Sequence, residues 1–158
     1  MGATGYSTVA AGKTITDAYR RACDEANAYS GHQEGYSGDI QTSNGFTEFV
    51  LPKGLTIAKL YKLAQAIEDH QYKLNRWEDD QRWGTAAQKK RKRPTEPAML
   101  ANSPHKYFAQ RYYDAVDDKW GAAAAIELTG KAAKDWKAAN GFKGTRAKVF
   151  TFSGTAAC

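Results

Sequence analysis

TIAKLYKLAQAIEDHQYKLNRWEDD, residues 56–80, carries the longest periodic pattern in the chain. Residues three, four and seven positions apart share one face of an α-helix, so the pattern predicts a helix over these residues. The apolar stripe is interrupted only at Gln71 and consists of Ile57, Leu60, Ala64, Ile67, Leu74 and Trp77. This face is expected to be core, or else to contact a second copy of the chain or another protein, because four of its residues fit two heptads of a coiled coil.

Before this helix, the patterns predict a strand, a helix and a hairpin. Residues 6–10 are short and β-branched between glycines, which favours a strand. Thr14 and Asp17 form a capping-box pattern, and a stripe of mostly small apolar residues runs from there to Gly31. That helix should therefore pack closely on a sheet. The pair Asn44–Gly45 between two alternating runs indicates a hairpin with a type I′ turn.

After the helix over 56–80, the chain alternates between helix and strand signals. Ser103–Pro104 is a typical helix start, and residues 122–128 and 148–152 are expected to be strands. Residues 131–140 fit a short helix or a lysine-rich loop. Together these elements predict an α+β fold, with two or three helices packed on one face of a small antiparallel sheet.

Length and composition favour one soluble domain over residues 1–158, with an exposed basic linker at 84–98. The chain has 158 residues, of which 42% are hydrophobic and 25% charged, and this is enough to bury a core without disulfides. Two cysteines make no disulfide framework, and no apolar run reaches the length of a membrane span. We expect a cytoplasmic protein with no membrane partner.

The charge changes sign along the chain at a run of five cations, residues 89–93, which ends at Pro94. Residues 1–80 contain 8 Lys/Arg and 11 Asp/Glu, whereas residues 81–158 contain 15 and 6. An asymmetry of this kind favours a polyanionic partner for the second part.

Aromatic residues interleave with these cations, and the combination is typical of nucleic-acid binding. Cations that neutralise phosphates release condensed counterions, and aromatic rings stack on unpaired bases. The residues expected to bind nucleic acid are Arg82, Trp83, Lys89, Lys90, Arg91, Lys92, Arg93, Lys106, Tyr107, Arg111 and Tyr112. The alternative is that the basic linker only confers solubility and that Tyr107, Phe108 and Tyr112 belong to the core.

No residues form a recognisable catalytic, cofactor or metal motif. His32, Glu34 and Asp39 cluster near a glycine-rich turn, where a general base or metal ligands could lie, but a His-x-Glu pair is common in solvated loops. The interpretation of these three residues stays open. We expect no cofactor, and a binding protein rather than an enzyme.

Two further motifs resemble those of small accessory proteins of tailed phages that infect actinobacteria. They are YSGDIQT, residues 36–42, and DKWGAAAAI, residues 118–126, which precedes a Phe-rich C-terminal strand. The resemblance covers about a quarter of the chain and leaves out residues 55–103. It implies a protein acting in the cytoplasm of a bacterial host, and it implies no activity.

These observations lead to one main prediction and one alternative. The main prediction is a small basic, phage-encoded protein whose region 82–112 contacts nucleic acid through phosphates. The alternative is a host-protein-binding or anti-defence factor that acts by protein–protein interaction. A homodimer through the helix over 56–80 is compatible with either.

Overall fold

A computed structural model describes residues 3–31 and 38–157 of the chain. The chain forms two compact units: a sheet unit, Met1–Val50 with Asp114–Cys158, and a helical unit, Leu51–Tyr113. The sequence patterns predict one domain, whereas the helical unit is inserted between two parts of the sheet unit. The sign of this division in the sequence is the resemblance described above, which leaves out residues 55–103.

The sheet unit is built on four strands in the order β1-β4-β3-β2. Strands β1 (Ala3–Gly12) and β4 (Lys148–Ala157) pair antiparallel along their whole length, and β3 (Ala123–Leu128) pairs antiparallel with β4. The short edge strand β2 (Phe46–Glu48) runs parallel to β3. The α+β class is confirmed, but the sheet is mixed rather than wholly antiparallel.

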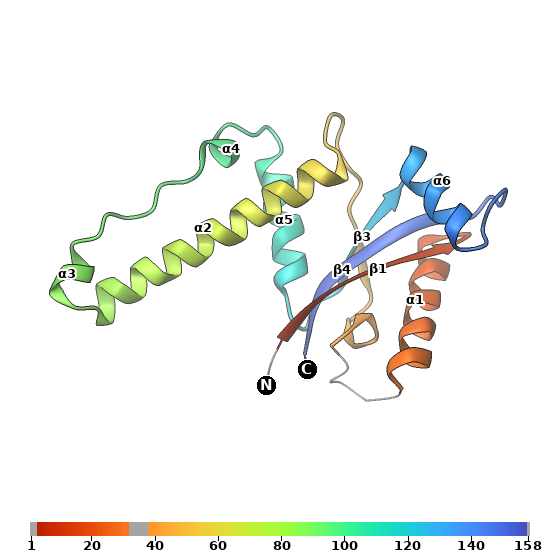
Figure 1. Ribbon diagram of the computed structural model, residues 1–158, viewed down its shortest axis with the longest axis horizontal. Coiled ribbons are helices and arrows are strands. Elements are labelled where there is room, and N and C mark those ends of the chain that lie inside the picture. Colours follow the sequence, from red (N-terminus) through yellow and green to blue (C-terminus); the bar gives the residue numbers. More distant parts are fainter. Residues whose placement is uncertain (1–2, 32–37, 158) are drawn as a thin grey trace. The chain divides into compact units, whose positions relative to one another are not determined.

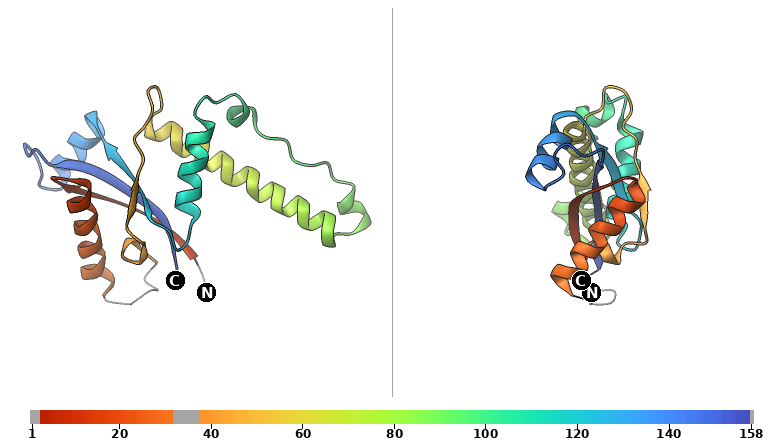
Figure 2. Two further views of the ribbon diagram at one scale, coloured as in Figure 1. Left: turned by 180° about the vertical axis from the view of Figure 1, so that it is seen from behind. Right: turned by 90° about the vertical axis from the view of Figure 1, so that its right-hand side faces the viewer.

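Helix α1 (Ile15–Ser30) lies along one face of this sheet, as Figures 1 and 2 show. Its start is the predicted capping box, in which Thr14 and Asp17 each accept a hydrogen bond from the other's backbone N–H. The small residues Ala18 and Ala22 face the sheet and are buried against Phe150 and Phe152. Because alanine side chains are small, they leave room for the two phenylalanine rings between the helix and the sheet.

The hairpin predicted at Asn44–Gly45 is wrong. Residues 40–42 form a short 3₁₀ helix, η1 (Ile40–Thr42), capped by Asp39, and only then does β2 begin. A type I′ turn needs positive φ at both central residues, and here Gly45 has φ +80° whereas no non-glycine residue in the described ranges has positive φ. The backbone N–H of Asn44 instead donates to the carbonyl of Gly121, which leads the chain into β2 beside β3.

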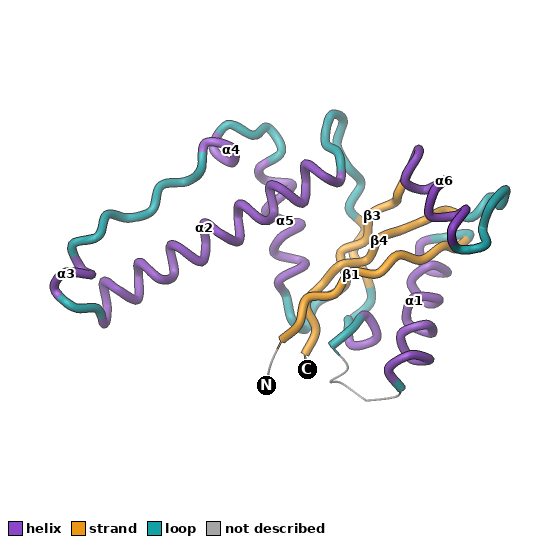
Figure 3. Tube along the Cα trace, in the orientation of Figure 1, coloured by secondary structure: helices purple, strands orange, loops and turns teal. Residues whose placement is uncertain are grey.

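The helical unit contains the predicted long helix as α2 (Ile57–Trp83), capped at its start by the Thr56 side chain. It is followed by a single turn, α3 (Ala86–Lys89), a long connection, a second turn, α4 (Ala98–Ala101), and α5 (Lys106–Asp117). Figure 3 shows the long connection between α3 and α4, and the views in Figures 1 and 2 agree that it returns alongside α2. The core of this unit consists of Leu55, Leu60, Leu63, Ile67, Leu100, Ala109 and Tyr112.

Residues 131–140 fit either a short helix or a lysine-rich loop from sequence, and the structure has a helix there, α6 (Gly130–Ala139). Of the helices in the described ranges, none combines the length and the apolar character needed to cross a membrane.

Tyr6 gives the sheet unit a measurable pH dependence. Burial raises the pKa of Tyr6 to about 12 and outweighs its hydrogen bond with Ser43, which acts in the opposite direction. Because the unfolded chain loses this proton near pH 10, the contribution of Tyr6 to stability is complete below pH 10 and is lost as the pH rises toward 12. In urea titrations, Tyr6→Phe should therefore flatten the fall in unfolding free energy over that range. Tyr29→Phe, at an exposed position, is the control, and an equal slope in wild type and Tyr6→Phe would contradict the assignment.

Candidate nucleic-acid interface

The excess positive charge of the protein lies entirely in the helical unit. Residues 51–113 contain 13 Lys/Arg and 6 Asp/Glu, whereas the remaining residues contain 10 and 11. The net charge of the helical unit is therefore +7 and that of the sheet unit is −1. The division at residue 80, with net charges of −3 and +9, separates the charges more sharply, but the unit boundary assigns the whole excess to one compact unit.

The pentabasic run is folded onto the C-terminal half of α2. The indole Nε1–H of Trp77 donates a hydrogen bond of 2.9 Å to the carbonyl oxygen of Arg91. The Arg91 guanidinium forms an ion pair of 2.9 Å with Asp80, one turn further along the helix. The guanidinium of Arg93 lies 5.9 Å from the centre of the Trp77 ring, in cation–π geometry. These contacts form what we call the Trp77 clamp.

Between Trp77 and Arg91, the single turn α3 directs the chain back toward α2. Thr85 and Gln88 make a second capping box, which satisfies the backbone donors at the start of this single turn. Most residues of the predicted linker 84–98 are exposed. The linker is therefore exposed but also folded, with its position fixed at Arg91 and Arg93 by α2.

This arrangement gathers seven of the predicted binding residues at the far end of α2, in a surface we call the basic tip. Trp83, the last residue of α2, is 80% exposed and lies next in sequence to Arg82. Exposed cations around an exposed indole can contact phosphates and stack on an unpaired base. The basic tip consists of Arg82, Trp83, Lys89, Lys90, Arg91, Lys92 and Arg93.

The predicted residues on α5 are less suited to binding a polyanion. Lys106 forms an ion pair of 2.6 Å with Glu96, which offsets its charge, although Tyr107 is 83% exposed and Arg111 is exposed. Tyr112 is only 4% exposed, and its ring centre lies 6.0 Å from that of Tyr61. The prediction that Tyr112 binds nucleic acid is therefore corrected, because a ring packed against α2 in the core cannot stack on a base.

The two groups of predicted residues also lie far apart within the helical unit. Tyr112 packs at Tyr61, whereas the basic tip begins 21 residues later along the same helix, at Arg82. With a rise of about 1.5 Å per residue, this separates the groups by roughly 30 Å. That distance is about nine base pairs at 3.4 Å per pair, so only an extended polyanion could contact both groups.

Of the predicted loop cluster, only Asp39 lies within the described residues. His32 and Glu34 lie outside the described residues, and the Asp39 side chain caps η1 by accepting a hydrogen bond of 3.1 Å from the N–H of Gln41. Across residues 3–31 and 38–157 no group of three or more His, Cys, Asp or Glu is placed to hold a metal ion. Asp39 therefore has a structural role at this turn.

Sequence reasoning missed Trp77 and Asp80 as the residues that position the basic run. Trp77 belongs to the apolar stripe, but the last buried residue of that stripe is Ile67, ten positions earlier. The sequence signal for this contact is the tryptophan at the C-terminal end of the apolar stripe, shortly before the basic run. Such a ring indicates that the chain after the helix folds back and covers it.

No protein-family model, curated protein or solved structure matches the chain.

The Trp77 clamp makes a testable prediction about proteolysis. Trp77→Ala removes the hydrogen bond to Arg91 and the ring beneath Arg93, each worth about 0.5–1 kcal/mol at an exposed site. Limited trypsin digestion should therefore cut within residues 89–93 several times faster than in wild type. Tyr72→Ala, at an exposed position on the same helix, is the control. Equal cleavage rates in Trp77→Ala and wild type would show that the clamp does not hold the run.

Proposed function

We propose that this protein binds nucleic acid through its phosphates, and that the basic tip makes the main contact. The observation that carries the proposal is the gathering of six cations and an exposed indole at one end of α2, in a unit with a net charge of +7. The prediction from sequence extended over residues 82–112. The ion pair of Lys106 and the burial of Tyr112 lead us to narrow the proposed main contact to residues 82–93, and Tyr107 on α5 is an exposed ring that an extended ligand could reach.

Five cations of the tip can neutralise phosphates while Arg91 keeps its ion pair with Asp80. The logarithm of affinity for duplex DNA falls with the logarithm of salt concentration with a slope of about −0.9 per neutralised phosphate, so five contacts correspond to a slope of about −4 to −5. Such contacts position a backbone without reading sequence. Binding should therefore depend strongly on salt and weakly on sequence.

Trp83 supports a preference for ends, loops or single strands. An indole that is 80% exposed can stack on an unpaired base, and stacking tolerates any base because each presents a π-face. Within a fully paired duplex the same ring has no base to stack on. The proposal therefore includes tighter binding to single-stranded than to double-stranded probes of equal length at the same salt.

The salt dependence can be tested without disturbing the Trp77 clamp. In Lys89→Gln/Lys90→Gln/Lys92→Gln, the slope of log affinity against log salt should become less steep by about 2 to 3, measured by fluorescence anisotropy with a labelled oligonucleotide. The matched control is Lys131→Gln/Lys134→Gln/Lys143→Gln, which removes the same charge from exposed positions in the sheet unit. The control should keep the wild-type slope.

Two outcomes would overturn the proposal. One is the absence of nucleic-acid binding at low salt by the wild-type protein. The other is an equal change of slope in both triple variants, because this would mean that net charge, rather than the basic tip, governs the interaction.

The phage context and the bacterial cytoplasm are part of the proposal and rest on the sequence resemblance. The alternative function, binding to a host protein, has a structural feature of its own in the helical unit, an apolar pocket.

A further inference from the structure

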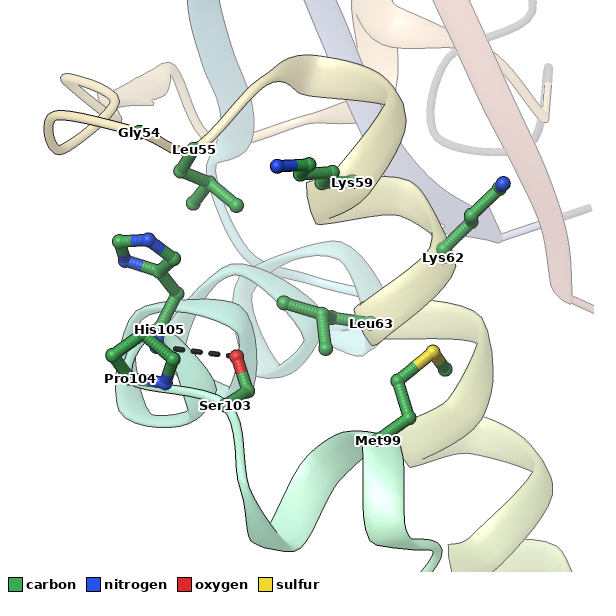
Figure 4. Close-up of a pocket in the computed structure, with 9 residues that line it drawn as sticks. All are labelled: Gly54, Leu55, Lys59, Lys62, Leu63, Met99, Ser103, Pro104 and His105. Carbon is green, nitrogen blue, oxygen red and sulfur yellow. Dashed lines mark hydrogen bonds between the residues drawn. The ribbon is translucent and has the colours of Figure 1, made fainter.

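The pocket lies at the other end of the helical unit from the basic tip, between the start of α2 and the α4–α5 connection. Its volume is about 470 Å³, which is within the range of pockets that bind ligands. Leu55 and Leu63 form a buried apolar floor, while Met99, which is 50% exposed, and Pro104 add apolar surface. Figure 4 shows these side chains around one space.

The charged residues on the pocket are lysines. Lys59 and Lys62 line it beside the imidazole of His105, and no Asp or Glu is among the described residues of the lining. Figure 4 shows Lys59 extending toward Leu55, whereas Lys62 extends away from the other lining residues. The pocket thus combines an apolar interior with a cation at its edge, and the ligand it complements is anionic and apolar at once.

The pocket lacks a stacking platform for a nucleobase. Among the residues that the structure describes, no Phe, Tyr or Trp lines it, and unpaired bases usually stack on such rings. The Ser103 hydroxyl already accepts a hydrogen bond of 3.2 Å from the backbone N–H of His105. An apolar amino-acid side chain needs neither stacking nor hydrogen bonds, and it fits the aliphatic floor better than a base does.

We propose that this pocket binds a peptide segment of a partner protein, which places one large apolar side chain between Leu55, Leu63 and Met99 and a carboxylate at Lys59. Apolar anchors seated in a hydrophobic groove are a common mode of peptide recognition, and flanking charge complementarity sets the register. The proposal does not depend on nucleic-acid binding, because the basic tip contributes no residue to the pocket.

The sharpest variant is Lys59→Glu, because it reverses the charge of the pocket while preserving the helix. Residue 59 is the third residue of α2, and its backbone N–H donates to the Thr56 side chain. A glutamate there completes a capping box with Thr56 and should leave α2 at least as stable. Lys73→Glu, exposed on the same helix but outside the pocket, is the matched control. Met99→Glu tests the apolar surface at a half-exposed position.

The probes are capped hexapeptides with a central Leu, Phe, Met or Trp flanked by glutamates, and matched peptides in which glutamine replaces glutamate. Binding is followed by methyl NMR of Leu55, Leu63 and Met99. At least one acidic peptide should shift these methyl signals, and its glutamine counterpart should bind about two- to fivefold more weakly, as expected for a solvent-exposed ion pair. Lys59→Glu should weaken binding of the acidic peptide at least fivefold and leave the glutamine peptide unaffected. Met99→Glu should weaken both, whereas Lys73→Glu should weaken neither.

Three results would overturn the proposal: no peptide shifts the methyl signals, acidic and glutamine peptides bind equally, or Lys59→Glu and Lys73→Glu act alike. Tighter binding of decanoate, or of a short single-stranded oligonucleotide, at the same methyl groups would replace the peptide by a lipid-like or nucleic-acid ligand.

The variant Lys89→Gln/Lys90→Gln/Lys92→Gln separates the two proposals, because it should lose nucleic-acid affinity while keeping the affinity for the acidic peptide.

Discussion

The indole of Trp77 is the contact on which the arrangement of charge in the helical unit depends. Five adjacent cations repel one another, and a free segment of this composition would extend into solvent. Here the same ring donates a hydrogen bond to the backbone at Arg91 and lies beneath the guanidinium of Arg93, while Asp80 pairs with Arg91. The contacts at Arg91 and Arg93 offset part of the free-energy cost of ordering the basic segment, and the lysines of the segment remain at the surface. Much of the entropy of ordering the segment is thus lost on folding rather than on binding, which favours affinity for a polyanion.

The two units divide the chemistry of the chain between them. The sheet unit has almost no net charge, and its core is a close contact between the small residues of α1 and the phenylalanines of β4. The helical unit carries the net positive charge, and its buried residues lie in the first three turns of α2 and in the elements that pack there. The rest of α2 has no buried residue and carries the Trp77 clamp. A long helix with a core at one end only is suited to presenting a surface at its other end.

Prediction from sequence succeeded where a pattern was local and repeated. The stripe from Ile57 to Trp77, the capping box at Thr14 and the strand at residues 148–152 all depend on neighbours within a few residues, and each appears in the structure. The prediction of a hairpin at Asn44–Gly45 was wrong because residues 40–42 form the 3₁₀ helix η1 and not a first strand. The hydrogen bond from Asn44 to Gly121, 77 residues away, fixed the chain next to β3. Such a partner cannot be read from a turn motif.

The same distinction applies to the candidate interface. The cations and Trp83 were predicted from composition, and exposure at the end of α2 agrees with that interpretation. Tyr112 has the same residue type and a similar neighbourhood as Tyr107, and only the direction of each side chain from α5 separates a buried ring from an exposed one. The pocket was not predicted at all, because Leu55, Leu63 and Met99 come from three segments that meet only in the fold.

The most direct test of the account is an amide and indole NMR titration of the intact protein with a short nucleic-acid probe of mixed sequence at low ionic strength. If the basic tip binds nucleic acid, the signals of Arg82, Lys89–Arg93 and the Trp83 indole should shift most, those of the sheet unit should stay in place, and added salt should reverse the changes. Shifts centred on the lysines of α6, or no shifts at any probe concentration, would contradict it.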